Sequence, residues 1–197
     1  MLRVAVVRFP RISNFTDVDA LAVEPGVDVT FVDSPGPLAD ADLVVLPGTR
    51  ATLDDLAWLR DRGMEGPLVQ RHRGGQPILG ICGGFQMLGE RITDPQGVET
   101  GRPAAALGLG LLPVRTSFRH EKVLGRPRGS ALGHEVEGYE IHHGEVQVRG
   151  GTPFLDGCRD DATWGTLWHG ALEDDGFRRA FLSAVAADAN RAGWSPG

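Results

Sequence analysis

The sequence predicts an open α/β fold, in which a mostly parallel sheet carries helices on both faces and additional β pieces follow in the second half. One run, residues 3–7, is continuously apolar and rich in valine, which is typical of a strand buried on both faces of a parallel sheet, and three further runs are strand candidates. Segments with helical periodicity separate these runs, and that alternation indicates right-handed βαβ units. The apolar runs of the first half cover residues 3–7, 28–32, 42–46 and 77–81.

Three helices are expected in the first half of the chain. The hydroxyl of Thr52 can cap the first of them, and Asp55 follows three residues later, as in a capping box. The stretch 93–106 has no clear periodicity and predicts a loop. The three helical segments cover residues 52–62, 67–73 and 85–91.

The second half changes character and predicts short β pieces followed by one helix. The final helix has Phe177, Phe181 and Val185 on one face at a helical spacing. No repeat or linker interrupts the chain, so residues 1–197 are interpreted as a single domain. The expected β pieces cover residues 111–118, 136–142, 145–148 and 163–168.

Composition limits the class of protein. Hydrophobic residues make up 41% and charged residues 23%, as in soluble globular domains. No apolar run approaches the ~18 residues of a spanning helix, and the apolar run at the start of the sequence is too short for a signal peptide. The net charge is −6 without a basic cluster, which disfavours nucleic acid as a partner. Two cysteines give no disulfide framework, so a cytoplasmic location is expected.

Cys82 lies in the turn Gly-Ile-Cys-Gly-Gly at residues 80–84, between an expected strand and an expected helix. This arrangement is the thiol counterpart of the nucleophile elbow, which needs small neighbours because backbone segments approach closely there. A helix N-terminus favours the thiolate form. The alternative is that Cys82 is a small buried hydrophobic residue. For Cys158, which lacks this context, a structural or surface role is expected.

Residues 80–89 resemble the nucleophile segment of class I glutamine amidotransferases, in particular the branch that contains cobyric acid synthase. The loop Leu-Pro-Gly-Thr-Arg at residues 46–50 is similar to the oxyanion loop of that class. The resemblance implies a flavodoxin-like fold and hydrolysis of L-glutamine, with Cys82 as the nucleophile. Three further segments match as well: residues 8–17, 138–144 and 164–170. Together the matching segments show that the resemblance extends from residue 3 to about residue 181.

The nucleophile needs a base, and His169 is the expected one. It ends an expected strand and precedes a glycine, at the sheet edge where sites of α/β proteins assemble. The resemblance places the catalytic histidine of the class at the same position. His142 and His143 are neighbours in an expected strand and should point to opposite faces, so a two-histidine metal site is not expected. The resemblance favours His142 as the residue near the site, and the alternative is a solvent-facing strand histidine.

The resemblance also covers the remaining roles. Many class I enzymes have a carboxylate two residues after the histidine, but Ala171 occupies that position here. A Cys–His dyad is therefore expected, with Glu173 as an alternative orienting group. Gln86 is expected to help hold glutamine, or else to be a helix-surface residue. Gly48 and the backbone after Cys82, at Gly83, are expected to supply oxyanion donors.

Relatives of this kind pass ammonia to an ATP-dependent synthetase that amidates corrinoid carboxylates. The chain has no G-x-x-x-x-G-K-[ST] loop, so the synthetase domain is expected to be absent from it, and ATP and Mg²⁺ are expected only in that domain. No cofactor or metal is expected in this chain. Two other readings remain open: the glutaminase subunit of a lipid II amidating complex, and a non-catalytic binding domain with the same fold.

Overall fold

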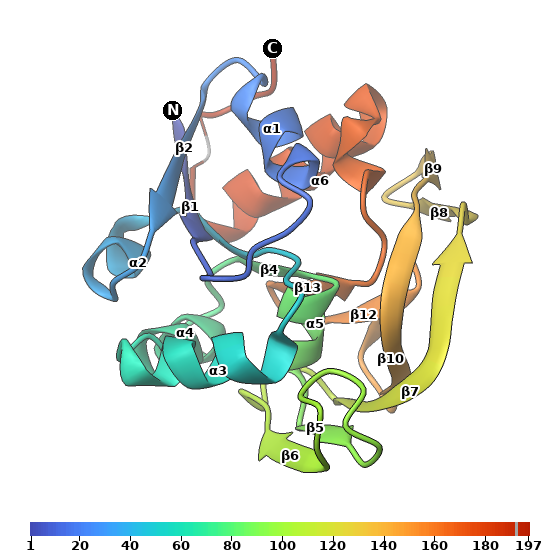
Figure 1. Cartoon of the computed structure of the whole chain (residues 1–197). Coiled ribbons are helices and arrows are strands. Elements are labelled where there is room, and N and C mark those ends of the chain that lie inside the picture. The colour runs from blue at the N-terminus through green and yellow to red at the C-terminus, as the bar shows by residue number, and fades with distance from the viewer. Residues whose placement is uncertain (192) are drawn as a thin grey trace.

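The computed structural model describes residues 1–191 and 193–197, and its central feature is a seven-stranded sheet (Figure 1). Its strands are β1 (Leu2–Val7), β2 (Val27–Val32), β3 (Leu43–Leu46), β4 (Ile78–Ile81), β11 (Thr152–Phe154), β12 (Gly157–Asp160) and β13 (Thr163–Thr166). They are ordered β11-β12-β13-β4-β3-β1-β2. The strands from β13 to β2 run parallel, and β11 and β12 extend one edge in antiparallel fashion. The α/β class is confirmed.

Helices cover both faces of this sheet (Figure 1). Helices α1 (Thr16–Ala22) and α6 (Asp175–Asp188) lie on one side, together with the 3₁₀ turn η1 (Ala171–Glu173). On the other side lie α3 (Thr52–Asp61) and α4 (Glu65–Arg73), together with α2 (Gly36–Asp40) and α5 (Gly83–Leu88). Sequence periodicity did not predict α1 and α2, which are only 7 and 5 residues long. None of the described helices is long and apolar enough to cross a membrane.

Strand β1 shows how one sheet serves two cores. Successive side chains of a strand point to opposite faces. Val4 and Val6 pack with the residues of α1 and α6, whereas Ala5 and Val7 pack with those of α3 and α4. All four are buried, which accounts for a run of apolar residues without polar alternation.

A second sheet stands beside the first and corrects the prediction for this part of the chain. It has the order β10-β7-β5-β6, formed by β5 (Arg91–Asp94), β6 (Ala104–Leu107), β7 (Val114–Gly125) and β10 (Glu140–Val148). A small hairpin of β8 (Arg128–Ala131) and β9 (His134–Glu137) follows β7. The expected loop at 93–106 is wrong at both ends, because β5 and β6 pair there. The pieces expected at 136–142 and 145–148 are instead β9 and a continuous β10.

Close backbone contact at the Cys82 turn leads to a test of stability. A Cβ atom on Gly84 would overlap the Leu46 carbonyl, whereas one on Gly66, in α4, would meet nothing within 4 Å. We expect Gly84→Ala to lower the free energy of unfolding by about 1–3 kcal/mol or more, since backbone cannot yield as a side chain can. Gly66→Ala should be neutral or slightly stabilising. Urea titrations of both variants provide the measurement, and equal stability of the two would contradict the close packing at Gly84.

Candidate active site

Cys82 occupies a sharp turn between β4 and α5. Its backbone has φ 49° and ψ −109°, in a region that residues other than glycine seldom adopt. Helix α5 begins at Gly83, two residues earlier than the sequence suggested, so Cys82 stands directly at the helix N-terminus. The side chain is 6% exposed and lines a cavity of about 400 Å³. A strained turn that presents a thiol to a cavity is the geometry of a nucleophile elbow.

Two glycines bring the backbone close to the thiol. The Cys82 N–H donates to the Thr166 carbonyl at 2.8 Å, so the next available N–H is that of Gly83. Gly83 lies against Thr49, because a Cβ atom there would come within 2.6 Å of the Thr49 methyl carbon. A Cβ atom on Gly48 would come within 2.8 Å of His169 Cε1. Gly48 therefore lies against His169, and Gly83 directly follows Cys82.

His169 is fully buried, and a carboxylate holds its ring. Asp17 Oδ2 lies 2.6 Å from His169 Nδ1, and its other oxygen accepts the Gly170 N–H at 2.7 Å. Asp17 is 2% exposed and comes from the first turn of α1, far from His169 in the chain. A carboxylate that receives Nδ1–H fixes the tautomer and orientation of an imidazole base.

The dyad expected from the sequence is therefore corrected to a Cys82–His169–Asp17 arrangement. Glu173, the alternative orienting group, is exposed, and the Nδ1 atom of His169 is bound by Asp17 instead. The reason is topological. Helix α1 packs against the turn η1 that follows His169. This contact places Asp17 beside the ring, although Asp17 lies far from His169 in the sequence.

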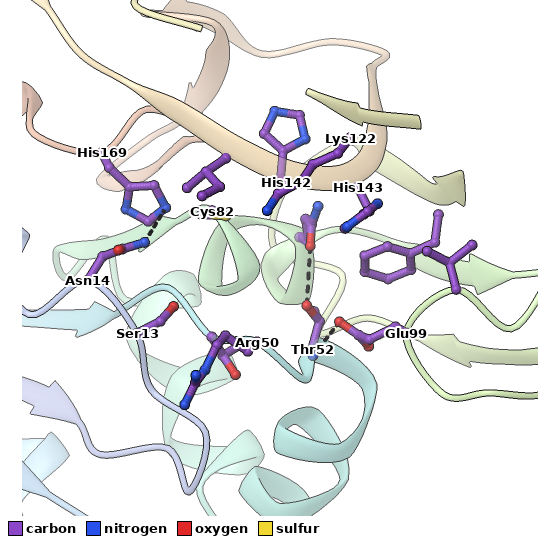
Figure 2. Close-up of a pocket in the computed structure, with 15 residues that line it drawn as sticks. Ser13, Asn14, Arg50, Thr52, Cys82, Glu99, Lys122, His142, His143 and His169 are labelled. Atoms are coloured by element: carbon purple, nitrogen blue, oxygen red, sulfur yellow. Dashed lines mark hydrogen bonds between the residues drawn. The ribbon is translucent and has the colours of Figure 1, made fainter. Parts of the chain in front are cut away.

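Two further side chains fix the His169 ring. Tyr139 stacks on it, with ring centroids 5.2 Å apart and an interplanar angle of 25°. The backbones of Tyr139 and His169 also exchange two hydrogen bonds of 2.9 Å each. The Asn14 side-chain amide lies 3.1 Å from Nε2 (Figure 2). Residues 14–17 thus contact both ring nitrogens.

The charge state of His169 follows from these neighbours. Burial alone would lower its pKa, but hydrogen bonds to Asp17 and Cys82, together with the charges of those groups, raise the pKa to about 10. An imidazolium is therefore favoured next to the thiol at neutral pH. Such a group can give a proton to a departing amine.

Gln86 lines the same cavity one helical turn after Cys82. Its Oε1 accepts from the Thr52 hydroxyl at 3.3 Å, while its buried Nε2 has no hydrogen-bond partner among the described residues. A substrate oxygen could use that N–H, because unsatisfied buried donors are costly. The expected helix-surface alternative is wrong, since Gln86 is 2% exposed. Thr52 does not cap α3 as expected either; the N-cap position is Ala51.

The pair His142 and His143 departs from regular strand geometry. Both line the cavity with Cys82, although neighbours in a regular strand face opposite sides (Figure 2). The pairing of β10 with β7 shifts register between His142 and Gly144, so the strand is irregular where it borders the cavity. The solvent-facing alternative for His142 is wrong. Among the described residues no group of three His, Cys, Asp or Glu side chains is placed to hold a metal ion.

The CobB/CobQ-like glutamine amidotransferase domain family matches residues 3–177 of the chain. The chain belongs to this family. The match includes Asp17, Gly48, Cys82 and His169, so all four residues lie within the amidotransferase domain.

Close relatives of this amidotransferase domain are named cobyric acid synthase. That of Streptomyces avermitilis is 64% identical over 191 residues, which cover 97% of this chain and 38% of the relative. That of Streptomyces coelicolor is 62% identical over the same shares, and that of Mycobacterium tuberculosis is 58% identical over 91% of this chain and 37% of the relative. The amidotransferase domain thus spans about two fifths of the length of these relatives.

Solved structures show the same fold at low sequence identity. A crystal structure of a glutamine amidotransferase has a TM-score of 0.67 at 19% identity and covers 93% of this chain and 98% of its own. PurLQS from Thermotoga maritima has a TM-score of 0.63 at 15% identity and covers 98% of this chain and 99% of that one. These likenesses confirm the class I amidotransferase fold expected from the sequence.

Asp17 is the main residue that sequence reasoning missed. Residues 8–17 carry part of the family resemblance, and Asp17 is the last of them, but they served only as a family marker. The spacing gives no hint, because 152 positions separate Asp17 from His169. A buried carboxylate in a short helix that the hydrophobic pattern did not predict has no local signature.

Proposed function

We propose that the chain hydrolyses L-glutamine to glutamate and ammonia, with Cys82 as the nucleophile. The main support is the placement of Cys82 and His169 in one cavity, with Asp17 bonded to His169 from behind, in a domain of an amidotransferase family. The Cys82 thiolate attacks the carboxamide carbon of the side chain, and the carbonyl oxygen becomes an oxyanion between the N–H groups of Gly48 and Gly83.

Collapse of this intermediate completes the first half of the reaction. His169 gives its proton to the nitrogen of the carboxamide, the C–N bond breaks, and ammonia leaves a glutamyl thioester on Cys82. His169 then takes a proton from water as the water attacks the thioester. The C–S bond of the thioester breaks, Cys82 leaves as a thiolate beside the protonated His169, and glutamate is released. Asp17 keeps the imidazole oriented through both steps.

The ammonia is proposed to serve a synthetase that amidates corrinoid carboxylates with ATP and Mg²⁺, as part of a cobyric acid synthase in cobalamin biosynthesis. The identities of 58–64% to proteins of that name support this assignment over the lipid II alternative. Since the chain spans only part of those relatives, the synthetase is proposed to be a second domain or a partner subunit. The location is proposed to be cytoplasmic.

Covalent labelling tests the glutaminase proposal. The glutamine analogue diazo-oxo-norleucine should alkylate Cys82 and leave Cys158 unmodified, because Cys158 is fully buried and burial raises its thiol pKa to about 11. Peptide mapping by mass spectrometry gives the site, and excess L-glutamine should protect it. Protein that stays unlabelled at Cys82, while iodoacetamide does modify that residue, would contradict a glutamine site and favour a non-catalytic domain.

A further inference from the structure

Asp55 is a buried carboxylate in the first turn of α3, with a side chain that is 1% exposed. The sequence suggested a capping box with Thr52, but the carboxylate bonds to Thr49 and Arg11 instead. A single oxygen, Oδ2, accepts both the Thr49 hydroxyl and, at 3.3 Å, the Arg11 N–H. Burial raises the pKa of Asp55, and these two hydrogen bonds oppose that rise only in part. Asp55 thus joins the β1–α1 loop, which contains Arg11, to the β3–α3 loop, which contains Thr49.

The two loops also bond to each other directly. The Arg50 N–H donates to the Arg11 carbonyl at 3.1 Å. Two residues further along the β1–α1 loop, the Ser13 N–H donates to the Gly48 carbonyl at 2.9 Å. An isolated antiparallel bridge lies between these two bonds. The loops therefore run side by side like a short pair of strands, and Asp55 binds both of them from α3.

Each loop also contacts the imidazole of the site. In the β1–α1 loop, the Asn14 amide lies 3.1 Å from His169 Nε2 (Figure 2). In the β3–α3 loop, Gly48 packs so closely on the ring that a Cβ atom there would come within 2.8 Å of His169 Cε1. A displacement of one loop relative to the other would therefore move the Gly48 N–H, one of the two proposed oxyanion donors, relative to the group that gives the proton.

Thr49 connects Asp55 to the second proposed donor as well. The Thr49 methyl group packs on the turn at Cys82, where a Cβ atom on Gly83 would come within 2.6 Å of it. The hydroxyl on the same carbon bonds to Asp55 and accepts the Ala51 N–H at 3.1 Å. A threonine side chain has few allowed rotamers, so a hydroxyl fixed by Asp55 also fixes the methyl group against Gly83.

We infer that Asp55 is a positioning residue for the oxyanion donors: through Thr49 it holds the β3–α3 loop, and with it the Gly48 N–H, in place beside the imidazole. This inference rests on the proposed glutaminase function. Thr49 lines the cavity at Cys82 and Asp55 does not, so Asp55 acts through Thr49. Contacts to an oxyanion strengthen only as the tetrahedral state forms. A misplaced donor therefore raises the barrier without weakening the binding of glutamine.

Steady-state kinetics of glutamate release test this role. Asp55→Ala removes the acceptor that the two loops share, and we expect kcat to fall about 100-fold while KM stays within about threefold. Asp55→Asn keeps an acceptor oxygen in nearly the same shape, although an amide accepts more weakly than a carboxylate, and should bring kcat to within about tenfold of the parent. Asp54→Ala, a change at the exposed neighbour in the same turn, is the matched control and should alter neither constant.

A double-mutant cycle tests the route through Thr49. Thr49→Val keeps the branched shape and removes the hydroxyl, so it should lower kcat about as much as Asp55→Ala. The double variant should lose little more than either single variant, because both changes remove the same link. Losses that multiply would overturn the route through Thr49. Thr49→Val also leaves Asp55 in place and carries the test if Asp55→Ala does not fold.

Two probes of Cys82 separate positioning from general support of the cavity. Glutamate γ-semialdehyde, the aldehyde counterpart of glutamine, adds to the thiol and forms a tetrahedral adduct with its oxygen where the oxyanion would form. We expect Asp55→Ala to weaken inhibition by this aldehyde about 100-fold. Iodoacetamide alkylates the thiolate without forming an oxyanion, so its rate of reaction with Cys82 should stay within about threefold.

The other outcomes overturn the inference in distinct ways. Equal losses in aldehyde inhibition and in iodoacetamide labelling would show that Asp55 only maintains the fold of the cavity. A kcat within threefold of the parent in both Asp55→Ala and Thr49→Val would show that the loops keep their places without this link, and it would leave the glutaminase proposal intact. A parent protein that neither releases glutamate nor is inhibited by the aldehyde would remove the glutaminase proposal together with the role of Asp55.

Discussion

Cys82→Ala is expected to abolish the release of glutamate from glutamine, with a loss of at least about 10⁴-fold in kcat. Without the thiol, water must attack the amide directly, because no covalent intermediate can divide the reaction into two easier steps. A coupled glutamate dehydrogenase assay measures the loss. Cys158→Ala is the matched control, because Cys158 lies outside the cavity, and it should retain activity.

A second readout distinguishes a chemical role from a structural one. In a protein that joins this domain to its proposed synthetase, Cys82→Ala should eliminate amidation with glutamine and keep amidation with added ammonia. Cys82 is needed only to release ammonia from glutamine. Ammonia added to the solution would reach the synthetase without that step. Loss of both activities together would indicate that Cys82 maintains the fold rather than the chemistry.

Asp17→Asn is expected to lower kcat on the order of 1000-fold with a much smaller change in KM. An amide can donate to Nδ1 as well as accept from it, so the imidazole loses both its fixed tautomer and the charge that stabilises its protonated form. Steady-state kinetics check the split between kcat and KM. Glu173→Gln is the control, because Glu173 is exposed; an equal loss there would return the orienting role to Glu173.

The same substitution has a pH signature. The pKa of His169 is about 10 in the folded protein against 6.5 for a free histidine. Between these values the folded state binds more protons than the unfolded state, so this stabilisation is complete below about pH 6.5 and is lost as the pH rises through about 10. Asp17→Asn lowers the folded pKa and should flatten that decline. Urea titrations at several pH values measure it, and an identical decline in both proteins would contradict the ion pair.

Sequence patterns predicted the parts of the fold that local physics controls. The strands at 3–7, 42–46 and 77–81 were recognisable, because burial on both sheet faces requires continuous apolar runs. The strand at 28–32 was also expected, although β2 is an edge strand with exposed side chains. The second sheet was expected only in part: β pieces were predicted where β7 and β10 lie, but β5 and β6 were not, since their Ala-rich and mixed segments adopt strand conformation through pairing with distant partners. The short helices α1 and α2 gave too few turns for a periodic pattern.

The site divides in the same way. Cys82, Gly83 and Gln86 follow one another within a single turn and helix, so their placement could be predicted from the motif. The placement of His142 and His143 could not, because both line the cavity where β10 shifts register against β7, and strand alternation alone predicts that only one of them would.

By itself, the sequence determined a thiol on a sharp turn after a buried strand, because glycine spacing and hydrophobic pattern are local properties of the chain. Only the tertiary structure decided what surrounds that thiol. Packing of α1 against the turn after His169 delivers Asp17 to the imidazole, and hydrogen bonds from the turn between β5 and β6 to Asp94 hold Glu99 at the wall of the cavity. Both carboxylates reach the site through contacts between distant segments, which no local spacing encodes.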